Sequence, residues 1–160
     1  MNMKTCGIIT EYNPFHQGHI YHIKKTKELT QCDCLITIVS NHFTQRGLFS
    51  LLTMQDKTKL ALEAGCNLVI ELPPCYAAQS ADYFAKYAVE SLSQLHIDQI
   101  CFGSETNNIS TLKEYSKQME STQVVPSLSM NQNLYTKNIR PNDILGIQYI
   151  KPVSYTHLTL

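Results

Sequence analysis

The stretch Thr5-Cys6-Gly7-Ile8-Ile9-Thr10-Glu11-Tyr12-Asn13-Pro14-Phe15-His16-Gln17-Gly18-His19 decides the fold. Its first six residues are mostly apolar and rich in β-branched side chains, which is typical of a buried strand, and Asn13-Pro14 marks a turn. Residues 18–29 follow with apolar side chains at helical spacing, at Ile20 and Ile23. A strand that turns directly into a helix is the first half of a βαβ unit.

The same alternation continues along the chain. Further apolar runs predict strands at residues 34–39, Leu68–Leu72 and 99–102. Helical patterns are expected at Met54–Ala64 and at residues 79–95, 110–119 and 141–149. Strands that alternate with helices in this way build consecutive βαβ units, so the sequence predicts an α/β fold with a Rossmann-like, doubly wound and mostly parallel sheet.

Local signals mark the ends of several elements. Gly65 is predicted to cap the helix before it, and Ser80 to cap the start of the next helix. Asp56-Lys57 fits the preference for a carboxylate in the first turn of a helix, so we interpret it as structural. Residues 41–53 and about 120–140 carry no periodicity and are expected to be long loops.

Composition bounds the function. The chain has 160 residues, of which 43% are hydrophobic and 16% charged, and its 13 Lys and Arg balance 13 Asp and Glu. A single core is therefore expected. The sequence has no run of 18 apolar residues, so no membrane span is predicted. The N-terminus lacks the features of a signal peptide, so the protein is expected to be cytoplasmic. Zero net charge fits poorly with a nucleic-acid partner, because phosphate contacts need local positive charge.

The six cysteines give no metal or disulfide signal. None forms a CxxC pair or a second cluster at zinc-finger spacing, and a cytoplasmic protein keeps its thiols reduced. Cys6, Cys34 and Cys101 lie in or beside apolar runs. We therefore expect free, mostly buried thiols.

Two histidines at the start of the first predicted helix carry the chemistry. His16 and His19 stand three residues apart, so both can face one ligand, and Gly18 between them lets the backbone approach a phosphate closely. A helix N-terminus at the carboxyl end of a strand binds anions. Two imidazoles that donate to phosphates stabilise the charge that develops as pyrophosphate leaves. A zinc site is the weaker alternative, because no nearby Cys or acid completes a ligand set.

This motif resembles the HxGH signature of the nucleotidylyltransferase superfamily, and residues 7–22 resemble the tRNA(Met) cytidine acetate ligase family. Further motifs match in the same order, at residues 40–47, 56–57, 68–73, 79–82, 102–105 and 141–146. The resemblance covers nearly all of residues 4–150 and implies the fold of the HxGH nucleotidylyltransferase type. It departs at Asn41, where the family usually has glycine, and it lacks an arginine that the family carries in a later Arg-Ile-Ser-Ser-like stretch.

The resemblance implies an ATP-dependent ligase, with ATP and Mg2+ as cofactors. Such an enzyme activates acetate as acetyl-adenylate and acetylates N4 of the wobble cytidine of elongator tRNA(Met). His16 and His19 are its implied catalytic residues, and no metal-ligating residue is implied. The implied ATP site comprises Ile9, Thr10, Glu11, Tyr12, Asn13, Pro14, Phe15, His16, Gln17, Gly18, His19, Ile20, Tyr21, His22, Gly103 and Asn142.

Other positions have alternative interpretations. Arg46 is a candidate contact to phosphate or to tRNA, or else a solvated surface residue. Gly103 permits close approach of a nucleotide, or forms a simple turn, and Ser104 and Glu105 cap the next segment or contact ribose. Glu71 orients a histidine or the loop 41–53, or lies at a sheet edge.

The HxGH turn alone also permits other functions. One is an adenylyl- or cytidylyltransferase that acts on a small metabolite, and another is an inactive fragment that only binds nucleotide. Pro152-Val153-Ser154-Tyr155-Thr156-His157-Leu158 follows no earlier pattern and resembles the translation of a sequencing adapter. We therefore predict a nucleotide-binding catalytic domain at residues 1–151, shortened at its C-terminal end, and a non-native tail at residues 152–160. The tRNA-binding surface is expected mainly in the missing C-terminal part.

Overall fold

The sheet occupies the centre of the molecule. A computed structural model describes residues 3–121 and 139–160. In these residues four parallel strands pair in the order β3-β2-β1-β4. They are β1 (Thr5–Thr10), β2 (Cys34–Ser40), β3 (Leu68–Leu72) and β4 (Gln99–Ile100). The predicted α/β fold with a parallel sheet is confirmed.

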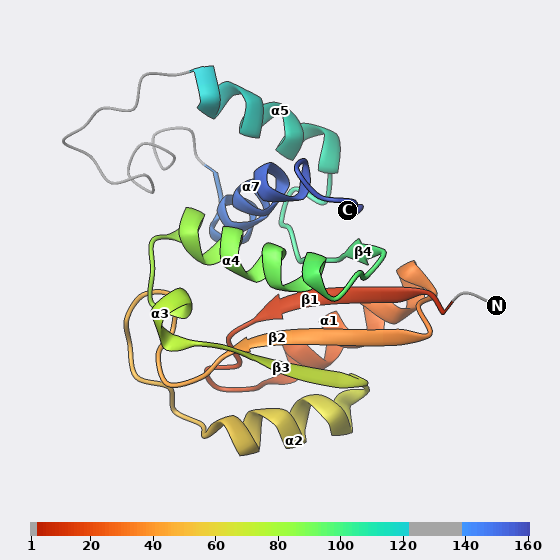
Figure 1. Cartoon of the computed structure of the whole chain (residues 1–160), viewed down its shortest axis with the longest axis vertical. Helices are drawn as coiled ribbons and strands as arrows, with labels where there is room; N and C mark the ends of the chain where they lie inside the picture. The colour runs from red at the N-terminus through yellow and green to blue at the C-terminus, as the bar shows by residue number, and fades with distance from the viewer. Residues whose placement is uncertain (1–2, 122–138) are drawn as a thin grey trace.

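Helices cover both faces of this sheet (Figure 1). The described helices are α1 (Gln17–Thr30), α2 (Met54–Ala64), α3 (Pro74–Ala77), α4 (Ala81–Gln94), α5 (Ile109–Ser121) and α7 (Pro141–Val153). Helices α1 and α2 pack on one face, whereas α4 packs on the other and contacts α7, which in turn contacts α5. No helix in the described parts of the chain is long and apolar enough to cross a membrane.

The two faces of the sheet form two separate cores. Ile8 and Leu35 pack toward α1 and α2, whereas Ile36 and Ile38 pack toward α4. Because both faces are covered, the strands carry apolar side chains at nearly every position, without alternation. A Cβ atom on Gly7 of β1 would lie 2.7 Å from Leu92 Cδ2, so glycine allows α4 to pack closely on the sheet.

Several elements differ in their bounds from the sequence prediction. β4 ends at Ile100 rather than at Phe102, whose ring packs against Tyr149 of α7 with ring centroids 5.6 Å apart. The helix predicted at residues 79–95 spans Ala81–Gln94, and Leu95, which follows its last residue, is exposed. The single-turn helix α3 begins at Pro74, where no helix was predicted.

The C-terminal residues extend the edge of the sheet. Helix α7 continues through Pro152, and the backbone of Thr159 accepts a hydrogen bond from Ile100 N at 2.7 Å. Leu158 is buried in the α4 core. These contacts do not test the origin of residues 152–160, so the non-native tail stays a prediction. The loop predicted at about 120–140 lies mostly outside the described residues.

The order of the strands places a crevice beside β1. The chain moves from β1 to β2 through α1 on one face, and from β3 to β4 through α4 on the other face. The direction of winding therefore reverses between β1 and β4. Ligands of doubly wound sheets bind at this point, outside the carboxyl ends of the strands, which lie at the left in Figure 1.

Candidate functional site

A cavity of about 1090 Å³ opens at this edge. The ends of β1 and β4, the start of α1 and the N-terminus of α7 line it. Most of the predicted site residues meet there: Ile9, Thr10, Glu11, Tyr12, Asn13, Pro14, His16, Gly18, His19, Tyr21, His22, Arg46, Gly103 and Asn142. Phe15, Gln17 and Ile20 are not among its lining residues.

The two histidines form the N-terminal cap of α1. The N-cap residue His16 accepts a hydrogen bond from Gly18 N at its Nδ1, at 3.0 Å, and His19 Nδ1 accepts one from His16 N at 3.1 Å. The two rings stack with centroids 3.9 Å apart. This reciprocal arrangement is a capping box built from imidazoles, which fixes both rings at the helix N-terminus.

These bonds determine which ring nitrogen carries the proton. A nitrogen that accepts a hydrogen bond from the backbone is unprotonated, so both neutral rings carry their proton on Nε2. Burial, together with the neighbouring His16 and His22, lowers the pKa of His19 to about 4. His19 is therefore neutral near neutral pH, and the pair offers two Nε2–H donors to the cavity.

His22 lies one turn further along α1. Burial lowers the pKa of His22, which favours its neutral form. Its Nε2 is buried and has no hydrogen-bond partner among the described residues. His22 therefore belongs to the wall of the cavity rather than to the exposed surface of the helix.

The position of Gly18 requires glycine for a second, steric reason. A Cβ atom at this position would lie 2.8 Å from His16 Cε1 and 3.0 Å from His16 Nδ1. The ring of the N-cap histidine therefore occupies the space that a side chain would need. The sequence predicted only close approach of a phosphate here, whereas the structure shows that the position of His16 itself requires glycine.

Glu11 and Asn13 hold the loop at residues 41–53. The carboxylate of Glu11 accepts a hydrogen bond from Gln45 N, and Asn13 Oδ1 accepts one from Leu51 N at 2.6 Å. Asn13 Nδ2 donates to Phe49 O at 3.5 Å. These two side chains, implied as part of an ATP site, contact the loop and so couple its position to the HxGH turn.

A buried lysine fixes the start of the same loop. Lys57 is fully buried, and its Nζ donates to Ser40 O at 2.7 Å and to Asn41 O at 3.2 Å. Burial lowers the pKa of Lys57, which the charge of Glu11 partly opposes. Asn41 Nδ2 donates to Glu71 Oε1 at 2.8 Å, so Glu71 contacts the loop and lies on the edge strand β3.

The opposite side of the cavity joins β4 to α7. The carboxylate of Glu105 accepts hydrogen bonds from the backbone N–H groups of Asn142, at 3.4 Å, and Asp143, at 3.1 Å. Glu105 therefore caps the N-terminus of α7 rather than the segment after β4. A Cβ atom on Gly103 would meet nothing within 4 Å, so this glycine faces open space in the cavity.

Asp143 completes a reciprocal clamp between the two segments. It is almost fully buried and accepts hydrogen bonds from the Ser104 and Thr106 hydroxyls and from Thr106 N. Burial by itself raises the pKa of Asp143, but these hydrogen bonds outweigh it and hold the pKa below its usual value. The clamp holds Gly103 and Asn142 on one wall of the cavity.

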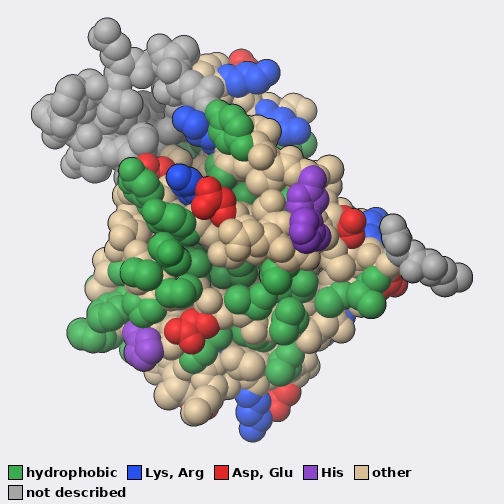
Figure 2. All heavy atoms as spheres, in the orientation of Figure 1, with side chains coloured by type: hydrophobic (Ala, Val, Ile, Leu, Met, Phe, Trp, Pro, Cys, Tyr) green, Lys and Arg blue, Asp and Glu red, His purple; other side chains and the backbone are tan. Residues whose placement is uncertain are grey.

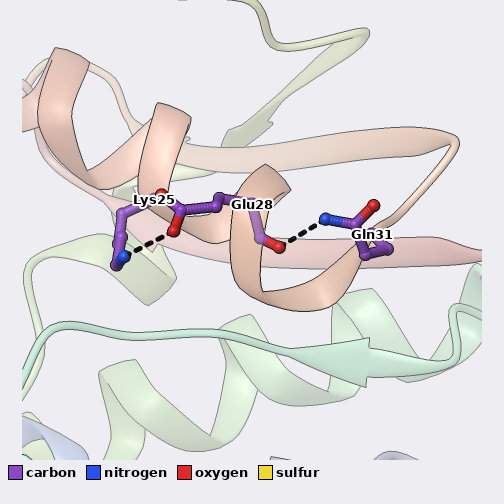
Figure 3. A network of polar contacts seen from close by, with 3 residues as sticks. All are labelled: Lys25, Glu28 and Gln31. Atoms are coloured by element: carbon purple, nitrogen blue, oxygen red, sulfur yellow. Dashed lines mark hydrogen bonds and ion pairs between the residues drawn. The ribbon is translucent and has the colours of Figure 1, made fainter.

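Lys25 and Arg46 are the lining residues with full positive charge. Figure 3 shows Lys25 Nζ bonded to Glu28 Oε1 at 2.8 Å, while Gln31 donates to the backbone of Glu28. This pair is exposed to solvent and contributes little to stability. Arg46 is exposed, and no carboxylate pairs with it in the described part of the chain. Among the same residues, no three His, Cys, Asp or Glu side chains gather closely enough to hold a metal ion.

The sequence and the architecture match known proteins. The model of the HIGH Nucleotidyl Transferase family matches residues 3–160. The chain belongs to this family. The similar curated proteins include the tRNA(Met) cytidine acetate ligases of Geobacillus sp., 40% identical, and Clostridium novyi, 41% identical. The alignments cover 94% and 93% of this chain but only 43% and 44% of those proteins, so the chain spans less than half the length of these relatives.

A solved structure agrees with this assignment. The crystal structure of Thermotoga maritima TmcAL bound with alpha-thio ATP matches with a TM-score of 0.83 and 29% sequence identity. The match covers 99% of this chain and 46% of that chain. The resemblance to the tRNA(Met) cytidine acetate ligase family that the motifs predicted is confirmed.

In this HIGH nucleotidyl transferase, sequence reasoning missed two residues that support the site. Lys57 was interpreted only as part of a helix start, although it shares a helical face with the buried Ala61. Asp143 entered the sequence analysis only as a member of the motif at residues 141–146, with no role of its own. An acidic residue in the first turn of a helix was its signal, but its partners, Ser104 and Thr106, are too distant in sequence to be recognised.

Proposed function

We propose that this chain carries the catalytic ATP site of a cytoplasmic tRNA(Met) cytidine acetate ligase. The observation that supports the proposal most is the pair of neutral imidazoles at the N-terminus of α1, with Nδ1 of each ring held by a backbone N–H. The names of the relatives supply the substrate class, and the crystal structure of T. maritima TmcAL bound with alpha-thio ATP supports ATP as the nucleotide.

The shape of the cavity fits a nucleoside triphosphate. Its volume is about 1090 Å³, large enough for such a ligand. We assign the triphosphate to the α1 side, where the helix dipole and the Nε2–H groups of His16 and His19 favour negative charge. The open space at Gly103 and the clamped N-terminus of α7 at Asn142 then receive the nucleoside.

In the first step, a carboxylate oxygen of acetate attacks the α-phosphorus of ATP. The bond from this phosphorus to the bridging oxygen breaks, and pyrophosphate leaves with the bonding electrons. Negative charge builds up on the departing oxygens, and the Nε2–H groups of His16 and His19 stabilise it by hydrogen bonding. Mg2+ would supply further positive charge toward the phosphates.

In the second step, N4 of the wobble cytidine attacks the carbonyl carbon of acetyl-adenylate. The carbon–oxygen bond to AMP breaks, N4 loses a proton, and the products are N4-acetylcytidine and AMP. No nucleophile of the protein is needed, because the adenylate already provides a good leaving group. The residues that carry tRNA are assigned mainly to the part of the relatives that this chain does not span.

Acetate-dependent exchange of radiolabelled pyrophosphate into ATP tests the first step. The 160-residue chain is expected to catalyse exchange with acetate in the absence of tRNA, and His16→Ala and His19→Ala should reduce it strongly. Lys24→Ala, on the exposed face of α1, is the matched control and should not change it. Exchange that is independent of acetate would favour a nucleotidylyltransferase of small metabolites, and ATP binding without any exchange would favour an inactive fragment.

A further inference from the structure

The loop beside the cavity presents large hydrophobic side chains to solvent. Leu48, Phe49 and Leu51 are 62%, 78% and 73% exposed. We call residues 48–51 the lip. Figure 2 shows hydrophobic side chains at the left edge of this face, where Figure 1 draws the loop between β2 and α2 and the helix α3. Exposure of three such side chains in four residues marks a surface that binds something.

The lip is exposed although its backbone is well held. Ser50 N donates to His42 O at 2.9 Å, and Thr44 N donates to Leu48 O at 2.8 Å. Asn13 bonds the backbone of both Phe49 and Leu51. Turning these side chains inward would break several of these bonds, so the fold holds them outward at a fixed place.

That place is the mouth of the cavity. Leu48 and Arg46 line the cavity from the loop, and Tyr21 and Lys25 line it from α1. Tyr21 is itself 67% exposed. The lip and the exposed face of α1 therefore border the cavity on the side assigned to the phosphates.

The charge of the loop indicates the class of that molecule. Residues 41–53 contain Arg46 and His42 but no Asp or Glu, in a chain whose net charge is zero. An exposed aromatic ring stacks on an unpaired nucleobase, aliphatic neighbours widen the platform, and an arginine binds the adjoining phosphate. A protein partner that bound the lip through hydrophobic contacts alone would not require the positive charge of Arg46 beside it.

We propose that the lip is the platform on which the acceptor nucleotide of a single-stranded RNA loop docks, with its base stacked on Phe49 and its phosphate at Arg46. This inference rests on the proposed function, which supplies RNA as the acceptor. It assigns to this chain a part of the RNA contact, next to the site where the acyl group is activated.

The absence of tryptophan from the chain makes a direct test possible. Phe49→Trp introduces a single indole, whose fluorescence is quenched when a base stacks on it. We expect a short single-stranded RNA centred on one cytidine to quench this emission, and a fully paired duplex of the same composition to leave it unchanged. Tyr155→Trp is the matched control, because Tyr155 is 79% exposed and lies outside the cavity lining.

Affinity measurements complete the test. Phe49→Ala should raise the Kd for the single-stranded RNA by about 5- to 150-fold, the loss of one stacked base. Arg46→Ala should raise it too and reduce its dependence on salt. Tyr155→Ala should leave it unchanged. The Kd for ATP is measured in parallel by calorimetry on each variant.

Several results would overturn the inference. Failure of the RNA to bind or to quench Phe49→Trp would do so, as would an unchanged RNA Kd in Phe49→Ala. If the wavelength of maximum emission of Phe49→Trp shifts with protein concentration in the absence of RNA, the lip is assigned to contact with a second copy of the chain instead. If ATP binds and exchanges pyrophosphate in any of these cases, the proposed function stands although the lip does not; if ATP does not bind, the proposed function fails by itself.

Discussion

Gly18→Ala separates the position of the N-cap histidine from the stability of the fold. The new Cβ would lie 2.8 Å from His16 Cε1, closer than real Cβ atoms come to a neighbour, and 3.0 Å from His16 Nδ1, which is also a tight contact. The ring of His16 must therefore leave its stacked position against His19, and the hydrogen bond from Gly18 N to Nδ1 is lost.

The effect on stability is small because two contributions oppose each other. Loss of an N-cap hydrogen bond costs about 0.5–2 kcal/mol. Replacement of glycine by alanine within a helix stabilises the folded state by roughly 0.5–1 kcal/mol. The free energy of unfolding should therefore fall by no more than about 1.5 kcal/mol, which urea denaturation measures.

The effect on ATP binding is larger. A hydrogen bond to a charged group is worth about 1.5–3 kcal/mol, so displacement of His16 should raise the Kd for ATP by about 10- to 150-fold. Calorimetric titration of the 160-residue chain measures this, with Lys24→Ala on the same helix as the control. If Gly18→Ala binds ATP as tightly as the unsubstituted chain, the assignment of the triphosphate to His16 is refuted.

Three further predictions concern stability. Gly146→Ala would place its Cβ 2.5 Å from Phe102 Cε2, so urea denaturation should show a loss of about 1–3 kcal/mol; an unchanged midpoint would contradict this packing. Lys57→Met leaves two buried carbonyls without their donor and should cost about 1–3 kcal/mol, which thermal unfolding would detect; an unchanged Tm would show that the lysine is dispensable. Burial above all lowers the pKa of His19 to about 4, whereas a histidine in the unfolded chain has a pKa of about 6.5. Between these two values the unfolded chain binds a proton that the folded chain does not, so the free energy of unfolding should decrease as the pH is lowered from about 6.5 to about 4. His19→Gln should lose this part of the acid sensitivity in urea titrations, and an unaltered pH profile would argue against a buried neutral ring.

The elements that sequence predicted well are those whose signals are local. Parallel strands covered on both faces appear as continuous apolar runs, and Gly65 has the left-handed backbone conformation expected of a helix C-cap. The HxGH turn was recognisable because its two histidines and its glycine are adjacent in sequence. These residues also share one cavity, as the position at the end of β1 indicated.

The parts that sequence missed depend on contacts between distant residues. Ser80 occupies the predicted N-cap position, yet its hydroxyl bonds the Asp82 carboxylate instead of a backbone N–H. The loop 41–53 carries no periodicity because its order comes from Glu11, Asn13 and Lys57, side chains outside it. Periodicity cannot indicate such cross-links, because each one pairs single polar atoms across the fold.

The protonation state of the two imidazoles tests the central claim most directly. Nitrogen-15 NMR of the labelled histidine side chains, recorded near neutral pH with and without ATP, distinguishes protonated from unprotonated ring nitrogens. We expect His16 and His19 to be neutral and to carry their proton on Nε2, and we expect the Nε2 resonances of both to shift when ATP is added. A proton on Nδ1 in either ring, or Nε2 resonances that stay unchanged while ATP binds, would contradict it.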